Sequence, residues 1–293
     1  MDQELLVFKT VVDKENFSLA AKELHITQPA VSRYIKVLEN KMNSKLLERN
    51  NKMVRVTRAG EIVYHHAKEI LSLYDRMESL VEGMMSIPAG KLSIGASYTF
   101  GEYILPHVIA NLRRSFPLIN PSISIGNTSE IIQQVTARQL DVGIIEGKIK
   151  NDNMFKERFS IDTMVVVVSA FHPIANQEEV LLSELEQETW IVREPGSGTR
   201  EVTDEMFEDY RFKPESVMEF GSTQIIKESV EAGLGVSFLS SWTIRKELAL
   251  GTIKVLNIKG FPIRRNFTLV KQDTLFQTKA MEVFIDILHN KIN

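Results

Sequence analysis

The first 60 residues place apolar and polar side chains at the spacing of three short helices. In residues 2–13, "DQELLVFKTVVD", apolar side chains recur three and four positions apart, which predicts an amphipathic helix. We expect a second helix with Ser18 as its N-cap, and a third that begins at Thr27 or Gln28 with Pro29 in its first turn. Residues 45–57 then read as two short strands around the polar tip "NNK". Together these elements predict a winged helix-turn-helix.

The third predicted helix has an apolar face and an opposite polar face. Its apolar face comprises Val31, Tyr34, Ile35 and Leu38, and its opposite face is polar. Such a helix fits the major groove of DNA, where Arg and Lys can donate to guanine or phosphate and Gln can pair with adenine. A solvated face is the alternative, and for the two wing residues Arg49 and Lys52 both readings stay open. The candidate DNA-contacting residues are Thr27, Gln28, Pro29, Ser32, Arg33, Lys36, Arg49 and Lys52.

A long helix is predicted after Thr57, which we expect to cap it. Apolar residues then recur alternately four and three positions apart, the spacing of a coiled-coil seam. Dimerisation through this seam is favoured because one short recognition helix covers few base pairs, and packing against the head is the alternative. Gly83, Pro88 and Gly90 predict the end of the helix and the start of a linker. The seam comprises Val63, Ala67, Ile70, Tyr74, Met77, Val81 and Met84.

From Lys91 onward, short apolar strands alternate with helical stretches. This alternation predicts parallel α/β sheets, and about 200 residues of this kind fit two small lobes better than one. Ligands are then expected at the carboxyl ends of the strands. The predicted fold class is an N-terminal α winged helix-turn-helix with a long linker helix, followed by an α/β two-lobed domain. The predicted domains are residues 1–58, 59–90 and 91–293.

Composition narrows the function classes. The chain has 293 residues, 43% hydrophobic and 25% charged, as expected of a folded protein. The sequence shows neither a secretory leader nor an apolar run long enough to cross a bilayer, which predicts a cytoplasmic protein without a membrane partner. The absence of cysteine excludes disulfides and thiolate chemistry. Basic residues outnumber acidic ones in residues 1–60 and the reverse holds afterwards, which suggests that the head meets a polyanion.

The segment "FSLAAKELHITQPAVSRYIKVLENKMNSKLLERNNKMVRVTRAG" resembles the DNA-binding segment of the LysR-type bacterial transcriptional regulators. The resemblance rests on the Ala-Ala pair, the Thr-Gln-Pro-Ala-Val-Ser-Arg start of the third helix, a Leu-Glu pair and the Thr-Arg-Ala-Gly start of the linker helix. It departs at Leu47 and Val56, where the family usually has Phe and Leu. It implies binding to double-stranded DNA as a homodimer that assembles into a homotetramer, and recruitment of RNA polymerase.

The resemblance extends more loosely through "LDVGII", "HPIA" and "VEAGLGVSFLS" to the effector-binding domain of this family, which resembles periplasmic binding proteins. Gln139 departs from the family, where a Gly often precedes Leu-Asp. By this analogy lobe I comprises residues 91–161 and 268–293, and lobe II comprises residues 162–267.

Three loops at predicted strand ends concentrate hydroxyl and glycine residues, each before a predicted helix. Backbone N–H groups at a helix N-terminus, together with hydroxyls and a guanidinium, suit a small anion, although helix capping is the alternative for each hydroxyl. "REPGSGTRE" and the Ser-x-Thr loop resemble those of regulators tied to inorganic sulfur compounds, which implies sulfite or sulfate as the effector; an organic carboxylate would satisfy the same donors. The candidate effector-binding residues are Ser97, Tyr98, Thr99, Asn127, Thr128, Ser129, Glu146, Gly196, Ser197, Gly198, Thr199, Arg200, Ser222 and Thr223.

Other classes of function find less support. The six His residues lack the spacing of a metal site, and no catalytic residue, metal ligand or cofactor other than the small effector is predicted. Glu146 could in principle be a general acid, although closing the cleft by hydrogen bonding is a simpler use. A solute-binding protein is compatible with the α/β body, but the missing leader and the basic head argue against it.

Overall fold

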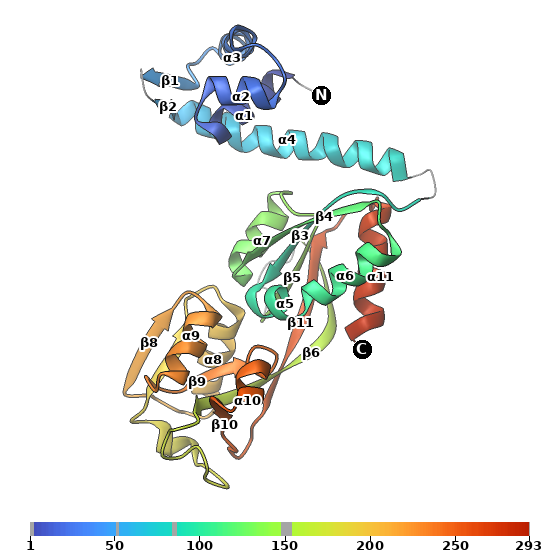
Figure 1. The fold of residues 1–293 in the computed structure, drawn as a ribbon. Helices are drawn as coiled ribbons and strands as arrows, with labels where there is room; N and C mark the ends of the chain where they lie inside the picture. The colour runs from blue at the N-terminus through green and yellow to red at the C-terminus, as the bar shows by residue number, and fades with distance from the viewer. Residues whose placement is uncertain (1–2, 51–52, 84–86, 148–153, 293) are drawn as a thin grey trace. The chain divides into compact units, whose positions relative to one another are not determined.

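The computed structural model describes residues 3–50, 53–83, 87–147 and 154–292 (Figure 1). The chain divides into two compact units, Met1–Met85 and Ser86–Asn293. The first unit contains helices α1 (Gln3–Lys14), α2 (Phe17–Glu23), α3 (Gln28–Lys41) and α4 (Arg58–Gly83), and strands β1 (Leu47–Asn50) and β2 (Met53–Val56).

The first three helices share one apolar core. Phe8 of α1, Ala20 of α2 and Val31 of α3 are fully buried there in one cluster. Helix α3 begins at Gln28, one of the two predicted starts, and Thr27 caps it by accepting a hydrogen bond from the Ala30 N–H at 3.4 Å. The prediction of Ser18 as the cap of α2 is wrong, because α2 starts at Phe17 and the Asn16 carboxamide accepts the Ser18 N–H at 2.8 Å.

A carboxylate fixes the β1–β2 wing to α3. The two strands pair antiparallel, with Leu47 opposite Val56. Glu39, near the end of α3, accepts the backbone N–H groups of Leu46 at 3.0 Å and Leu47 at 3.4 Å, and the Lys45 ammonium lies 2.8 Å from its other oxygen. The wing is therefore positioned against the helix that carries the predicted DNA contacts.

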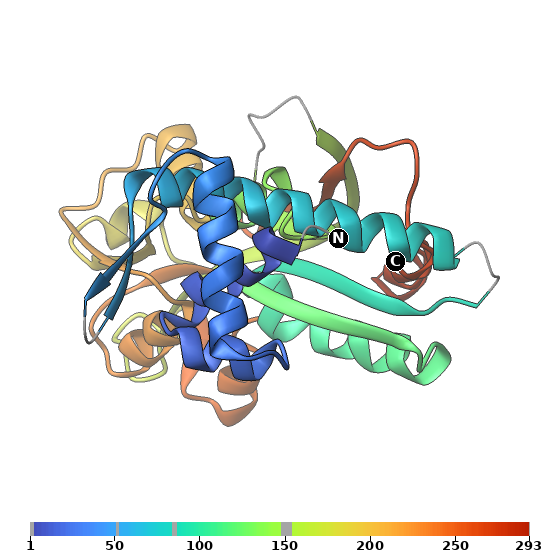
Figure 2. The same ribbon diagram turned by 90° about the horizontal axis from the view of Figure 1, so that it is seen from above.

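The long helix α4 divides into two halves. The Thr57 hydroxyl accepts the Gly60 N–H at 3.0 Å, which confirms the predicted cap. Val63 and Ala67 pack on the head core. Figures 1 and 2 show the C-terminal half of α4 extending beyond the three short helices of its unit. The alternative of packing against the head holds for the first turns of α4. Further along, Ile70, Met77 and Val81 are 39%, 52% and 62% exposed, and dimerisation through them stays a prediction.

The two remaining residues of the predicted seam are Tyr74 and Met84. Tyr74 is half-buried in the second half of α4. Met84 lies outside the described residues.

The second unit is a two-lobed α/β structure. Its helices are α5 (Tyr98–Tyr103), α6 (Leu105–Ser115), α7 (Thr128–Thr136), α8 (Gly198–Asp209), α9 (Thr223–Glu231), α10 (Arg245–Leu250) and α11 (Lys279–Ile292). Its strands are β3 (Gly90–Ser97), β4 (Ile119–Gly126), β5 (Val142–Glu146), β6 (Met154–Ser169), β7 (Thr189–Arg193), β8 (Ser216–Phe220), β9 (Ser237–Ser240), β10 (Ile253–Val255) and β11 (Ile263–Gln272). Within the described residues, no helix has the length and apolarity that a membrane span requires.

The first lobe is built on β4, β3, β5 and the adjoining parts of β11 and β6. Helices α6 and α11 cover one face of this sheet, and α7 covers the other (Figure 1). In the second lobe the pleat of β6 sends Val166 into the core beneath α8 and Val167 into the core beneath α9. Helices therefore cover both faces of the strands in each lobe.

The prediction of parallel sheets holds for β3, which pairs parallel with β4 and β5, and for β7 with β8. It is wrong for β6 and β11, which pair antiparallel along most of their length. The physical reason is the route of the chain: β6 leads from the first lobe to the second and β11 leads back, so the two crossover strands run in opposite directions (Figure 1). Side chains on these strands can contact both lobes.

Glu39→Gln tests the attachment of the wing. We expect it to lower the stability of α3 by about 1–3 kcal/mol at neutral pH, because a charged acceptor of three hydrogen bonds is lost. Burial raises the pKa of Glu39, but the hydrogen bonds from Lys45, Leu46 and Leu47 outweigh it and hold this pKa below the ordinary 4.5. The contribution is therefore complete above about 4.5 and is lost as the pH falls through the folded-state pKa.

Hydrogen exchange of the α3 amides is the suitable measurement, since both Trp residues lie in the second unit. The difference between Glu39→Gln and the parent should shrink on acidification. Glu48→Gln, on the exposed side of β1, is the matched control and should change little at any pH. An effect of Glu39→Gln that is independent of pH would contradict this account.

Candidate functional site

The polar face of α3 is accessible to a partner. Thr27, Gln28, Pro29, Arg33 and Lys36 are exposed, while Val31, Ile35 and Leu38 are buried, so the two predicted faces are observed. The Gln28 carboxamide donates to the Ser32 hydroxyl at 3.0 Å. The Arg33 guanidinium lies 5.8 Å from the centre of the Tyr34 ring. The helix therefore presents a row of polar groups that can reach base edges.

A groove runs between this face and the wing. It has a volume of about 480 Å³ and is lined in part by Ser32, Lys36 and Lys45. Two ammonium groups at its border suit the phosphate backbone of a nucleic acid. Of the two wing residues predicted to contact DNA, the Arg49 side chain and all of Lys52 lie outside the described residues.

The second site lies between the lobes and centres on Arg265 of β11. Its side chain is buried, with the residue 5% exposed. Its guanidinium donates to the Thr99 hydroxyl of the first lobe at 3.1 Å and to the Thr199 hydroxyl of the second at 3.0 Å. Two predicted effector residues from different lobes therefore meet on one cation.

Asp162 of β6 provides the countercharge for Arg265. The Arg265 Nε lies 2.7 Å from one Asp162 oxygen, and the aspartate is fully buried. Its other oxygen accepts the Ser240 hydroxyl at 2.6 Å and the Thr163 N–H at 2.8 Å. Arg265, Ser240 and Thr163 all donate to Asp162, so the ion pair is held in one geometry.

Glu146, at the end of β5, faces the same guanidinium from 3.8 Å and accepts the Phe100 N–H at 3.1 Å. Burial raises the pKa of Glu146; the charge of Arg265 opposes this and that of Asp162 adds to it. The lobes touch here, because the Cα of Gly198 packs on the Glu146 backbone and a Cβ would collide with the Glu146 carbonyl oxygen. Glycine at 198 thus serves close approach of the lobes.

A second buried cation lies at the end of β7. Arg193 forms a two-pronged ion pair with Glu194, with Nε at 2.7 Å and Nη2 at 2.8 Å from the two carboxylate oxygens. Its third nitrogen donates to the Thr223 hydroxyl at 3.1 Å, and its guanidinium lies 4.5 Å from the centre of the Tyr98 ring. The Asn127 carboxamide of the first lobe reaches Glu194 at 3.4 Å. Three predicted residues thus surround this ion pair.

The hydroxyls of Thr128 and Ser97 donate to backbone carbonyls of β5, next to the Arg265 cluster. The Thr128 hydroxyl donates to the Glu146 carbonyl at 2.9 Å, and the Ser97 hydroxyl donates to the Ile144 carbonyl at 3.3 Å. Ser197 and Ser222 cap α8 and α9, as the capping alternative proposed. Ser129 is exposed, and its N–H donates to the Gly196 carbonyl at 3.1 Å, another contact between the lobes.

Arg200 is not brought into either cluster. Its guanidinium is held by Asp204 at 2.9 Å, by Glu219 at 2.8 Å and by the Arg193 carbonyl at 2.8 Å. The prediction relied on a guanidinium in the "PGSGTR" loop, but the cations of the site are Arg193 and Arg265.

The sequence carried signals for these missed residues. Arg265 and Asp162 each interrupt an apolar strand, in "IRRNFTLV" and "SIDTMVVVV". A charge in a buried strand requires a partner, which points to a pair without saying which residues form it. Arg193 and Glu194 end the apolar strand "TWIVRE" in the same way.

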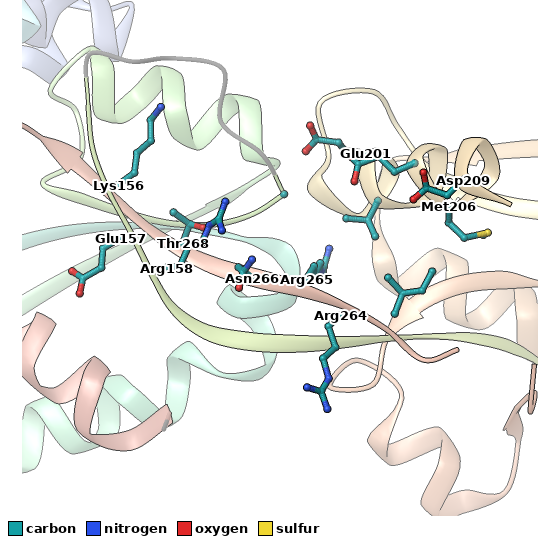
Figure 3. Close-up of a pocket in the computed structure, with 14 residues that line it drawn as sticks. Lys156, Glu157, Arg158, Glu201, Met206, Asp209, Arg264, Arg265, Asn266 and Thr268 are labelled. Atoms are coloured by element: carbon teal, nitrogen blue, oxygen red, sulfur yellow. The ribbon is translucent and has the colours of Figure 1, made fainter. Parts of the chain in front are cut away.

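A larger groove of about 850 Å³ opens beside the Arg265 cluster (Figure 3). One wall is the acidic face of α8, with Glu201, Glu205 and Asp209, and the other carries basic side chains of the crossover strands, including Arg158 and Arg264. Arg265 lines the same groove, so solvent reaches the border of the buried cluster. Among the described residues, no group of three His, Asp or Glu side chains could hold a metal ion.

Comparison with known proteins agrees with this architecture. The model "Bacterial regulatory helix-turn-helix protein, lysR family" matches residues 3–61, and "LysR substrate binding domain" matches residues 86–293. The chain is 37% identical to the HTH-type transcriptional regulator CysL of Bacillus subtilis, over 97% of this chain and 95% of CysL.

Two solved structures extend the comparison. The regulatory domain of CcmR from Synechocystis, in complex with 2-PG, has a TM-score of 0.65 at 25% identity, over 70% of this chain and 98% of that one. Full-length CbnR complexed with its target DNA has a TM-score of 0.75 at 18% identity, over 99% of both chains, and shows likeness of fold alone. The predicted fold class, a winged helix-turn-helix with a long helix followed by a two-lobed α/β domain, is confirmed.

Asp162→Asn tests the importance of the buried charge pair. We expect a loss of about 3–5 kcal/mol in the free energy of unfolding of the second unit, because Arg265 keeps its charge and loses its countercharge. Urea unfolding followed by the fluorescence of Trp190 and Trp242 measures it. Asp204→Asn removes an exposed carboxylate paired with Arg200 and should cost less than about 1 kcal/mol. Equal, small losses in both variants would contradict a structural role for the Arg265 pair.

Proposed function

The chain belongs to the LysR family of bacterial helix-turn-helix regulators, and from that premise we propose that it is a sequence-specific transcriptional regulator controlled by a small anion bound between its lobes. One observation carries the regulatory part of this proposal. Arg265 joins Thr99 of the first lobe to Thr199 of the second, so a ligand that alters this contact alters how the lobes are held together.

The DNA-binding part rests on the exposed polar face of α3. Arg33 and Lys36 provide cationic donors, and Gln28 provides an amide. Lys36 and Lys45 both line the adjacent groove. CbnR, which shares the fold, is solved on its target DNA. We propose that α3 of our protein enters the major groove and that the wing contacts the backbone.

The effector is a small anion in this proposal, with sulfite or sulfate as the first candidate. Two buried guanidinium groups and the hydroxyls of Thr99, Thr199 and Thr223 supply the donors that such an oxyanion requires. An organic acid is the second candidate, favoured by the complex of CcmR with 2-PG, since CcmR is similar to this chain over its regulatory domain. No metal or organic cofactor enters the proposal.

The assembly is a homodimer or homotetramer that acts in the cytoplasm. The exposed apolar residues Ile70, Met77 and Val81 along the second half of α4 support pairing through this helix. Two α3 helices would then read the two halves of an interrupted palindrome, and a change in lobe orientation would alter DNA bending and the contact with RNA polymerase.

Arg33→Ala tests the groove assignment. It should cost about 1–3 kcal/mol on the preferred operator and reduce discrimination between bases, because a donor to a base edge is lost. Fluorescence anisotropy with the operator and with scrambled duplexes measures both effects. Arg114→Ala, an exposed arginine of α6, removes the same charge elsewhere and should leave base preference intact. If Arg33→Ala weakened every duplex equally, α3 would not be the element that reads bases.

A thermal-shift screen tests the effector. An anion that binds only the folded chain raises its melting temperature, and sulfite, sulfate and small carboxylates are the set to compare. Thr99→Ala and Thr199→Ala should each weaken the response, because each removes a hydroxyl next to Arg265, while operator binding without anion stays at the parental level. A full response in both variants would place the anion outside this cluster. Failure of the parent chain to retain operator DNA at low salt would instead favour a solute-binding protein.

A further inference from the structure

Each cation between the lobes is already paired with a carboxylate of the chain. The described residues of the two clusters contribute two guanidinium groups, from Arg193 and Arg265, and three carboxyl groups. Glu146 faces Arg265 at 3.8 Å, without the close pairing that Asp162 has at 2.7 Å. Each guanidinium therefore has one carboxylate in tight contact. An anion that enters must replace one of these carboxylates, because adding a negative charge to a buried site whose cations are already paired is unfavourable.

The two ion pairs differ in how firmly the carboxylate is held. Asp162 is fully buried and accepts the Ser240 hydroxyl and the Thr163 N–H in addition to Arg265. The Glu194 side chain is 22% exposed, whereas that of Arg193 is 2% exposed. Apart from Arg193, the Glu194 carboxylate contacts its own backbone N–H and accepts a long hydrogen bond from Asn127 at 3.4 Å. Glu194 is therefore the carboxylate that solvent and a competing anion can reach.

We propose that Glu194 is an internal ligand of the inter-lobe cleft, and that the effector binds by displacing its carboxylate from the guanidinium of Arg193. This inference rests on the proposed anion-controlled function and adds the residue that receives the anion. It also assigns Glu194 a role in setting the concentration of effector to which the chain responds. The pKa of Glu194 supports it: burial raises this pKa, but the hydrogen bonds and charge of Arg193 outweigh burial and lower it, so the internal ligand is ionised at neutral pH.

The geometry defines the class of ligand. Arg193 offers Nε and Nη2 side by side to two oxygens, at 2.7 and 2.8 Å in the internal pair. A sulfate, a sulfite or a carboxylate can present two oxygens to this fork, whereas chloride cannot. Thr223 holds the third nitrogen and Tyr98 covers the guanidinium, so Arg193 keeps its place when Glu194 leaves.

The exchange also affects the contact between the lobes. Asn127 belongs to the first lobe and caps α7, while Glu194 belongs to the second. When the Glu194 carboxylate leaves Arg193, the Asn127 carboxamide loses this partner and becomes available to the anion that replaces it. Binding is thereby linked to a contact that joins the two lobes.

Glu194→Gln in the full-length chain tests the displacement. Titration calorimetry with sodium sulfate, at an ionic strength held constant with sodium chloride, measures the affinity. We expect the variant to bind sulfate about tenfold or more tightly than the parent. If Glu194 leaves the Arg193 fork free in about a tenth of the parent molecules, the parent binds about tenfold more weakly than a chain whose fork is always free. Acetate should also bind more tightly to Glu194→Gln than to the parent, because a carboxylate presents the same two oxygens to Arg193.

Two further variants make the result specific. Glu208→Gln removes an exposed carboxylate of α8 with the same change in net charge and should keep the parental sulfate affinity. Arg193→Lys keeps the positive charge and removes the fork, and should lower sulfate affinity at least tenfold both alone and combined with Glu194→Gln.

The outcomes separate this inference from the proposed function. A sulfate affinity of Glu194→Gln equal to or below that of the parent overturns the displacement, and so does an absence of measurable sulfate binding in both. An increase that Glu208→Gln shares equally reflects net charge alone and also overturns it. The proposed function is judged separately, by operator selectivity and by the response of operator binding to anions.

Discussion

The burial of the Arg265 guanidinium is the constraint on which the regulatory unit depends. A guanidinium stays charged at any physiological pH, and removing it from water is costly unless several acceptors replace the water. The chain supplies those acceptors from three places: Asp162 on the other crossover strand, Thr99 at the start of α5 and Thr199 at the start of α8. Because the acceptors come from both lobes, satisfying one charge also fixes how the lobes meet.

The same reasoning explains why this site suits regulation. Gly198 lets the backbones of the lobes touch at Glu146, and the charges of Arg193 and Arg265 are each matched by a carboxylate. In such a site, ligand binding exchanges one set of hydrogen bonds for another, and so its free energy depends on the arrangement of the lobes. The fixed pair with Asp162 preserves the fold, while the accessible pair with Glu194 leaves a place for exchange.

Much of the architecture could be predicted from the sequence because it follows from local patterns. The two faces of α3 follow from helical periodicity, and Thr57 caps α4 as its position before the helix indicates. Local reasoning failed at the start of α2, where Asn16 and Ser18 are both suitable N-cap residues. Asn16 is the cap, and the Ser18 N–H is one of the groups that donate to its side chain. The sequence gives no clear signal for strand β8, because four of its five residues are exposed, which removes the alternation that marks a half-buried strand.

The candidate site was predictable only in part. The hydroxyls of Thr99 and Thr199 could be found because they follow predicted strands, but the cation that they contact could not. Arg265 is 166 positions from Thr99 and 103 from Asp162, and their contact depends on the antiparallel crossover strands, whose pairing a periodic pattern does not specify. The sequence favours Arg200 over Arg193 as the cation of the site because Arg200 lies in the glycine-rich loop. In the structure, however, Arg200 pairs with Asp204 and Glu219.

The central claim is that a small anion enters the chain at the cluster that joins the lobes. Hydrogen exchange of the full-length chain, with and without the anion that most raises its melting temperature, measures this most directly. The account predicts that added protection is concentrated in residues 97–100, 193–200 and 263–267, with residues 3–50 little changed. Protection that appears mainly outside these three segments of the regulatory unit, or none at saturating anion, would contradict it.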